Sequence, residues 1–478
     1  MILTETNVRP PVRPEGWWDL PFRNIGQGKR CQKCCHFDQE RMQEQDPIER
    51  EAIAGRKQEH VDGTIQDRDI TVRTNLLSRQ AAKKPSNTGH GQILKLSVDG
   101  MDQAKFKMPR NLPGSADLSD CWRPALHVVG AVAQGHVEAY FIMDPDLKKD
   151  SNMNCTVVSR MLDLVYEGSF KNKDVVMPRS LAIGFDNTCR EGKNSIFSTL
   201  LAFLRATKVF EDTASQNLQP GHSHNEQDQL FSKTATLISR ASVLEDPYEV
   251  ADYIRNHLTP LKGHRLHVEV LDNTWDFQTW FWELGHQVKG LAATAGDKET
   301  CHSWQFVSAS SVDEICGANT TVEVTHSGWD KDDLQPDDVV LIAKKYVHST
   351  SAAQQPLLFL PHAVANRLSV DTLRWNTPNV FSDRTCKEFL KTAKAVGSHP
   401  WYLSRAQSYL ESLIANNKKG ARGKPVELDF VFNYRIASSL LLGVFVSMVV
   451  ELHGPNKIRF QGFCFQATQS NIHKYVAF

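Results

Sequence analysis

Two stretches of the chain, "QILKLSVDG" (residues 92–100) and "RSLAIGFDN" (residues 179–187), decide the fold. Each is a short apolar run that reaches an aspartate near its end, Asp99 in the first and Asp186 in the second. Short apolar runs bounded by turn residues are typical of buried strands. We therefore predict a sheet in which these two strands are neighbours and the 92–100 strand is central.

The segments around these two strands predict an α/β order. Two further strands, "ALHVVGAVAQG" and "HVEAYFIMD", are expected to be joined by a tight turn at Gln134-Gly135. Helices are predicted where apolar residues recur at helical spacing, over residues 152–168, 195–210 and 224–241. A strand before the last helix is assumed, because the sequence there has little β character. The predicted architecture is one three-layer α/β domain over residues 92–241.

The remaining sequence predicts flanking regions. Two helices are expected between residues 37 and 80, the second beginning just past Pro47, and a helix, a break and a helix over 383–418. Short strands are expected at 265–271, 303–309, 321–326, 338–346 and 357–360. The predicted regions are an irregular arm (1–24), a helical region (25–90), the α/β core (91–260), a small β-rich unit (261–365), and C-terminal helices with a tail (366–478).

Three aspartates are candidates for one metal site. Asp99 and Asp186 lie at strand ends, and Asp228 lies in the first turn of the helix predicted at 224–241. The carboxyl ends of strands in α/β sheets are where sites are built. Carboxylates held close together repel unless cations lie between them, and Mg²⁺ or Mn²⁺ prefers such oxygen ligands. Asp102, in "VDGMDQ", fits a turn cap better than a ligand.

The histidines of "PGHSHNEQDQLFSKT" (residues 220–234) allow three interpretations, the simplest of which is an ordinary polar helix start with His222 and His224 as core or capping residues. His222 and His224 can line the aspartate pocket as metal neighbours or proton donors. They can instead form the His-x-His of a metallohydrolase, although Glu226 and Gln227 then occupy positions where the metallo-β-lactamase pattern requires Asp and His. The metallohydrolase interpretation leaves Asp99 and Asp186 unexplained and therefore ranks second.

These motifs carry a family resemblance. The segments "SVDGMDQAKF" (97–106), "GFDNTCREGKN" (184–194) and "GHSHNEQDQLFS" (221–232) are similar to an uncharacterised eukaryotic domain family with the pattern D…DN…K-N…G-H-T-H…D…F-S. The order of elements also resembles the RNase H-like fold of transposases and integrases. That resemblance implies a mixed sheet, with catalytic acids on the first strand, after the fourth strand and on a late helix.

The cysteines predict a second site. Cys31 and Cys34, in a Cys-x-x-Cys spacing, and His60 supply three ligands of the type that zinc prefers. Cys35 or His36 is a candidate fourth ligand, and a helical hairpin can bridge the gap from Cys34 to His60. In the family named above, a Cys-x-x-Cys and a later histidine often precede the core. The ten cysteines are too sparse for a disulfide scaffold, which favours an intracellular protein.

Charge and hydropathy limit the partners. Lys+Arg and Asp+Glu are equal at 55 each, so nucleic acid must be bound through local basic patches. The basic residues that flank the aspartate motifs are Lys105, Lys107, Arg110, Arg190 and Lys193, although Lys193 also suits a helix start. The apolar run Ile436–Val450 is shorter than the roughly 20 residues of a membrane span and fits a buried element better.

Three functions remain open from the sequence. The first is a metal-dependent nuclease or transposase-like enzyme that derives from a transposon. Such an enzyme acts on DNA in the nucleus, and a homo-oligomer is compatible with this function. The second is the His-x-His metallohydrolase. The third is a non-catalytic descendant that binds nucleic acid or protein.

Overall fold

The fold is described from a computed structural model of the chain. It describes residues 31–112, 121–171, 173, 175–185, 194–218, 226–282, 301–324, 333–368, 372–399 and 403–417.

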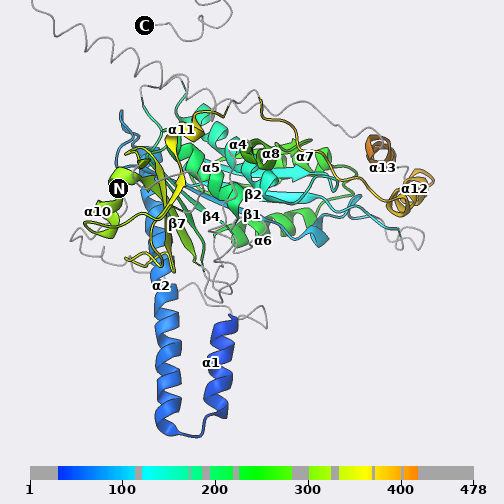
Figure 1. The fold of residues 1–478 in the computed structure, drawn as a ribbon. Coiled ribbons are helices and arrows are strands. Elements are labelled where there is room, and N and C mark those ends of the chain that lie inside the picture. Colours follow the sequence, from blue (N-terminus) through cyan, green and yellow to red (C-terminus); the bar gives the residue numbers. More distant parts are fainter. Residues whose placement is uncertain are drawn as a thin grey trace, which may run out of the picture. The chain divides into compact units, whose positions relative to one another are not determined.

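The described strands form one mixed sheet of nine strands in the order β6-β3-β2-β1-β4-β5-β7-β8-β9 (Figure 1). Their bounds are β1 Ile93–Gly100, β2 His127–Ala133, β3 Val137–Met143, β4 Ser180–Gly184, β5 Asp212–Gln216, β6 Arg265–Leu271, β7 Ser303–Ser308, β8 Val339–Lys344 and β9 Leu357–Leu360. The pairs β1/β4, β4/β5 and β3/β6 are parallel, and the other pairs are antiparallel.

The predicted neighbours are confirmed. β1 lies inside the sheet between β2 and β4, and it pairs with β4 in parallel from Ile93↔Ser180 to Ser97↔Gly184. β2 and β3 are joined by the predicted tight turn, where Gly135 has a φ of +87°. A Cβ there would lie 2.9 Å from Arg79 Cα, so both the conformation and the space require glycine. The assumed strand before residue 220 is present as β5.

Helices cover both faces of the sheet. One face carries α4 (Ser151–Ser169) and α5 (Ser195–Ala206), and the opposite face carries α6 (Glu226–Ser239) and α7 (Pro247–His257). Successive residues of a strand point to opposite faces of the sheet. On β6, Glu269 binds Arg160 of α4 at 3.1 Å, whereas its neighbour Val268 packs in the core cluster that contains α7. The three-layer α/β prediction is therefore confirmed in outline.

Local sequence explains where these helices begin. The Asp150 side chain accepts a hydrogen bond from Met153 N (3.2 Å) at the start of α4, and Asn194 accepts one from Phe197 N (3.1 Å) at the start of α5. Asp246 caps α7, whose first residue is a proline. Such caps satisfy backbone N–H groups that have no partner within the helix.

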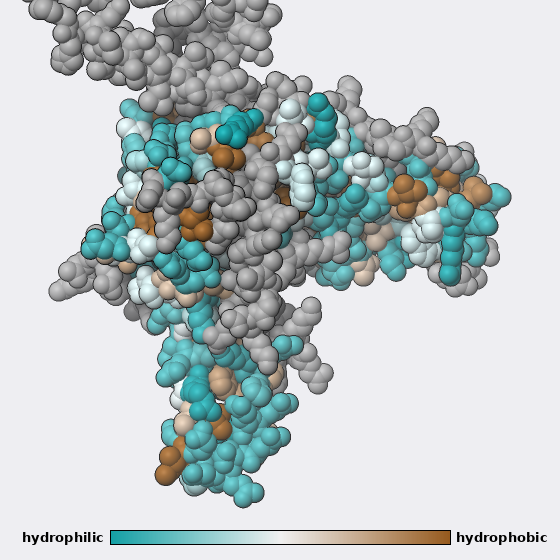
Figure 2. All heavy atoms as spheres, in the orientation of Figure 1, coloured by the Kyte–Doolittle hydropathy of each residue, from teal (hydrophilic) through white to brown (hydrophobic). Residues whose placement is uncertain are grey.

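The predicted pair of N-terminal helices is also confirmed. α1 spans Gln32–Gln43 and α2 spans Pro47–Lys83, with Asp46 capping α2 and Pro47 at its first position. α1 lies beside the first half of α2 as an antiparallel hairpin (Figure 1). No residue of α1 is buried. Figure 2 shows a mostly hydrophilic hairpin surface with apolar side chains near its tip, where Met42 is 85% exposed.

The strand pairing corrects one predicted region. The small β-rich unit expected over residues 261–365 is not a separate sheet, because β6 pairs with β3 and β7 pairs with β5. Its strands otherwise occur close to the predicted positions, except that the described part of 321–326 forms a single bridge, from Glu323 to Leu357. The other predicted boundaries stay predictions.

The shorter and later helices complete the described chain. These are η1 Gln103–Phe106, α8 Phe277–Trp282, α10 Val312–Cys316, α11 His362–Ala365, α12 Asp383–Gly397 and α13 Ser404–Asn417. α12 and α13 confirm the predicted helix, break and helix, and they pack in the same apolar cluster as α7. The apolar run Ile436–Val450 lies outside the described residues. Within the described part, no helix is both long enough and apolar enough to cross a membrane.

Candidate functional site

Three paired residues place Asp99 on the α6 face of the sheet. Asp99 of β1 pairs with Gly130 of β2, and Gly130 pairs with Tyr140 of β3. Residues directly opposite one another in antiparallel strands point to the same face. The Tyr140 hydroxyl lies 3.0 Å from the hydroxyl of Thr234 on α6. The Asp99 side chain therefore projects toward the layer that contains α6.

A close approach fixes α6 over this row of residues. A Cβ on Gly130 would lie 2.3 Å from Cε1 of Phe231, so the aromatic ring occupies the space above the glycine. Phe231 belongs to α6 and is partly buried against the main core cluster. The absent side chain at Gly130 thus lets α6 pack directly beside the residue that pairs with Asp99.

We expect Gly130→Ala to destabilise the fold by about 1–3 kcal/mol, because the new methyl group overlaps the Phe231 ring. In a double-mutant cycle with Phe231→Ala, the two costs should not add, since the smaller side chain frees the space that the methyl group needs. Urea unfolding of the four proteins measures this coupling. Strictly additive effects would show that α6 does not lie over Gly130.

Several predicted site residues lie outside the described residues. These are Asp186, Arg190, Lys193, His222 and His224. The backbone of Asp228 is in the first turn of α6, as predicted, but its side chain is outside the description. Leu230 and Ile238, which lie eight residues apart on α6, are both buried.

Asp99 and Asp102 have different local roles. Asp102 caps η1, where its carboxylate accepts a hydrogen bond from Ala104 N at 3.0 Å, which confirms its interpretation as a turn cap. Asp99 accepts a hydrogen bond from Gly100 N at 2.7 Å, and its side chain is half-buried. Of the two, Asp99 is the acid on the sheet face.

A buried lysine that the sequence did not single out lies on the same face of β1. Lys95 and Asp99 are four residues apart and therefore point to the same side of the strand. Lys95 is 1% exposed, and its Nζ donates to Oε1 of Gln216 on β5 at 3.0 Å. A Cβ on Gly184 would lie 3.5 Å from this Nζ, so the amine lies over the end of β4. Burial lowers the pKa of Lys95 to about 7.

This depressed pKa predicts a pH-dependent stability. Between pH 7 and 10.5 the unfolded chain binds the proton that folded Lys95 has lost, so the free energy of unfolding rises with pH by up to about 1.4 kcal/mol per unit. Lys95→Met removes this term. We expect the free energy of unfolding of the variant to exceed that of the wild type most near pH 7, and we expect this difference to shrink toward pH 10. Urea unfolding across this range measures the difference. A constant difference would contradict the buried amine.

Basic side chains gather after the strand that carries Asp99. Lys105 and Lys107 are exposed, and Arg110 is half-buried, with its guanidinium donating to the carbonyl of Lys105. Lys149, from the loop between β3 and α4, was not predicted. A Cβ on Gly100, the residue after Asp99, would lie 3.3 Å from Lys149 Nζ. Cationic side chains therefore lie at this end of β1 beside the carboxylates of Asp99 and Asp102, and such cations suit phosphate groups.

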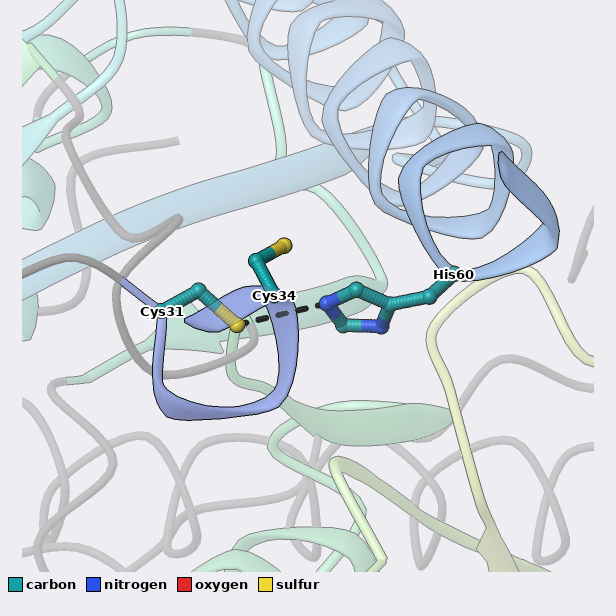
Figure 3. Close-up of side chains that lie close together, drawn as sticks. All are labelled: Cys31, Cys34 and His60. Atoms are coloured by element: carbon teal, nitrogen blue, oxygen red, sulfur yellow. Dashed lines mark hydrogen bonds between the residues drawn. The ribbon is translucent and has the colours of Figure 1, made fainter. Parts of the chain in front are cut away.

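The cysteine and histidine ligands come together as the sequence predicts. The ligand atoms of Cys31, Cys34 and His60 all lie within 4.8 Å of one another (Figure 3). Cys31 Sγ is 3.3 Å from His60 Nε2, close to the separation of about 3.5 Å that bonds of ~2.0–2.3 Å in a tetrahedron require. Cys31 and His60 are buried. The two cysteines lie at the start of α1, and His60 faces them from α2.

The charge states of this cluster suit a metal ion. Burial, and then the nearby Lys33, lowers the pKa of His60, so the imidazole is in the neutral form that binds metals. Burial and the neighbouring Cys31 raise the pKa of Cys34 to about 11. A cation between the two sulfurs would reverse that effect, because it favours thiolate. His36, one of the candidate fourth ligands, instead pairs with Glu40 at 3.0 Å and is largely exposed.

One comparison with known protein families gives a match over part of the chain. Residues 116–301 match the model of a domain of unknown function, DUF7869. This fits the predicted resemblance to an uncharacterised domain family and covers β2 to α8. Comparison with curated proteins gave no match, and neither did comparison with solved structures.

Proposed function

We propose that the protein is a divalent-metal-dependent enzyme that cleaves or joins phosphodiester bonds in DNA, of the type found in transposases and integrases. The observation that carries this proposal is the position of Asp99. It projects from an interior strand of a mixed sheet toward the layer that holds α6, beside a parallel strand whose sequence continues to a second aspartate.

The positions of Asp186 and Asp228 are inferred from nearby residues in the sequence whose contacts are described. Asp186 follows Gly184 by two positions, as Asp99 follows Ser97, and Ser97 and Gly184 are register partners. Asp228 precedes Phe231 by one helical turn, and Phe231 lies over the register partner of Asp99. We infer that the three aspartates share one pocket, with His222 or His224 at its rim.

The chemistry follows from such a set of carboxylates. Asp99, Asp186 and Asp228 would hold Mg²⁺ or Mn²⁺, and the metal would supply activation of a water or a 3′-hydroxyl and stabilisation of the leaving oxygen. Lys105, Lys107, Arg110 and Lys149 orient the phosphate backbone by charge. Lys95 points to the same face of β1 as Asp99 and adds a positive charge there below about pH 7. Its burial is costly in folding energy, which favours a role in function.

Two further observations support the proposal. The described order of elements, β1, β2, β3, α4, β4, α5, β5 and α6, is the order that led to the RNase H-like resemblance. The stretch that matches DUF7869, residues 116–301, covers β2 and the helix that carries Asp228, and it begins after Asp99. A DNA-processing enzyme of this ancestry would act in the nucleus.

We also propose that Cys31, Cys34 and His60 bind a structural zinc ion. α1 has no buried residue with which to anchor itself, and its N-terminal end is where the two cysteines meet His60. Small helical elements without a core of their own commonly depend on a metal. Zinc would hold α1 against α2 through its ligand bonds.

The proposal is tested with the full chain and labelled oligonucleotides. Single-stranded, duplex and branched DNA, and RNA of the same sequences, are incubated with Mg²⁺, with Mn²⁺ or with chelator. We expect metal-dependent cleavage or strand joining of DNA. Binding without any change in the strands would instead favour the non-catalytic descendant, and zinc-dependent hydrolysis that needs His222 and His224 but not Asp99 would favour the metallohydrolase.

A further inference from the structure

A carboxylate and a histidine that are distant in sequence meet on α2 near the zinc ligands. Nδ1 of His348 is 2.8 Å from Oδ1 of Asp67, and the backbone N–H of His348 donates to the same oxygen at 2.9 Å. Asp67 is fully buried, and His348 lies in the loop between β8 and β9. The His348 ring also stacks on Tyr346 at 5.3 Å with an interplanar angle of 6°. Two contacts of the ring and one of the backbone therefore fix this residue.

The other edge of the His348 ring lies against α2 at Gly63, one helical turn from His60 in the sequence. A Cβ on Gly63 would lie 3.1 Å from Cε1 of His348 and 3.6 Å from its Nε2. Gly63 is three residues after His60 and four before Asp67, so the three positions follow one face of the helix. The glycine gives the imidazole room to lie on the helix, one turn from the zinc ligand His60.

We propose that Nε2 of His348 is the fourth ligand of the metal held by Cys31, Cys34 and His60, which makes the site a Cys₂His₂ zinc centre. This inference rests on the zinc site proposed above. A zinc ion in a structural site takes four ligands, and the cluster as described supplies three. The Asp67–His348 pair has the arrangement of a metal-bound histidine, in which the nitrogen away from the metal bonds a carboxylate.

The alternatives near this cluster in the described part of the chain are weaker. Residues 1–30 contain neither cysteine nor histidine. His36 is turned toward Glu40 and largely exposed. Neither Cys35 nor His348 belongs to the group of ligand atoms that lie within 4.8 Å of one another. Of these two side chains, His348 is the one that a buried carboxylate orients. With His348 bound, the metal would join the α1–α2 hairpin to the β8–β9 loop of the sheet.

X-ray absorption at the zinc edge of the full-length protein tests the ligand set directly. We expect two sulfur and two nitrogen ligands in the wild type, and no change in Cys35→Ser. His348→Ala should lower zinc affinity by at least about 100-fold, the upper end of the effect of outer-shell changes. Affinity is measured by competition with a chromophoric chelator. Three sulfurs and one nitrogen in the wild type would show that a third cysteine is the ligand in place of His348 and overturn the assignment.

Two glycines of α2 provide a matched pair for the same assay. Gly63→Ala places a methyl group against the His348 ring, whereas a Cβ on Gly55 meets nothing within 4 Å. Both changes raise helix propensity equally. We expect zinc affinity to fall about 10-fold in Gly63→Ala, as for a change outside the ligands, and to stay unchanged in Gly55→Ala.

Failure of the zinc site and failure of His348 as its fourth ligand give different results. If the wild type binds no zinc, the metal site itself is wrong. If zinc is bound and is lost in Cys34→Ser but not in His348→Ala, the three-ligand site stands and His348 is not its fourth ligand.

Discussion

Asp99→Asn is expected to reduce magnesium-dependent strand cleavage or joining to background, a loss of at least about 1,000-fold, or about 4 kcal/mol of transition-state stabilisation. The amide keeps the size of the side chain but removes the negative charge that a divalent cation needs. The fold should be as stable as the wild type or more so, because the change relieves repulsion among the proposed carboxylates. Initial rates on labelled DNA and urea unfolding measure the two effects.

Asp102→Asn is the matched control. Asp102 lies three residues further along the same segment, where it caps η1, and asparagine caps a helix about as well as aspartate. Activity should therefore stay within about twofold of the wild type, since a cap of this kind is conserved by the change. If Asp99→Asn keeps its activity, or if both variants lose it equally, the sheet-face position of Asp99 is not what supports catalysis.

Cys34→Ser is expected to remove the zinc ion. The wild-type chain should retain about one zinc after dialysis, and the variant should retain none. Binding of structural zinc contributes about 10–16 kcal/mol in small zinc-binding peptides, so loss of one thiolate is a large change. Because α1 has no buried residue, we also expect the hairpin to become sensitive to proteases near residues 31–46. Elemental analysis and limited proteolysis measure the two results.

Cys35→Ser serves as the control in the same helix. It makes the same chemical change one position further along, outside the trio of ligand atoms. Its zinc content and protease resistance should equal those of the wild type. Equal zinc in both serine variants would mean that Cys34 is not a ligand.

Much of the fold was predictable from local pattern. The buried strands β1 and β4 are apolar runs with clear turn signals, and they pair as the neighbours that the sequence predicts. Capping residues such as Asp46 and Asp150 marked helix starts. β5 was the exception, because "DTASQ" has little β propensity and forms a strand through its pairing with β4 and β7.

What failed to be predicted depends on contacts between distant segments. The attachment of β6 to β3 and of β7 to β5 made one sheet of what the sequence divided into two units, and no local pattern encodes such pairing.

The candidate sites divide in the same way. The Cys-x-x-Cys spacing indicated the metal cluster, because both cysteines are local to one helix start. Lys95 gave no signal, since a lysine in an apolar strand is ordinarily read as a solvent-facing residue. The contact between Asp67 and His348 joins residues 281 positions apart, and only the folded chain brings them together.

Iron-directed cleavage of the polypeptide tests most directly whether the three aspartates share one metal. Fe²⁺ can replace Mg²⁺ at oxygen sites, and with ascorbate and peroxide it cuts the backbone nearest to it. We predict cuts near residues 99, 186 and 228 that excess Mg²⁺ suppresses and that disappear in Asp99→Asn. Cuts at one of these segments alone, or none that Mg²⁺ suppresses, would contradict a shared carboxylate site.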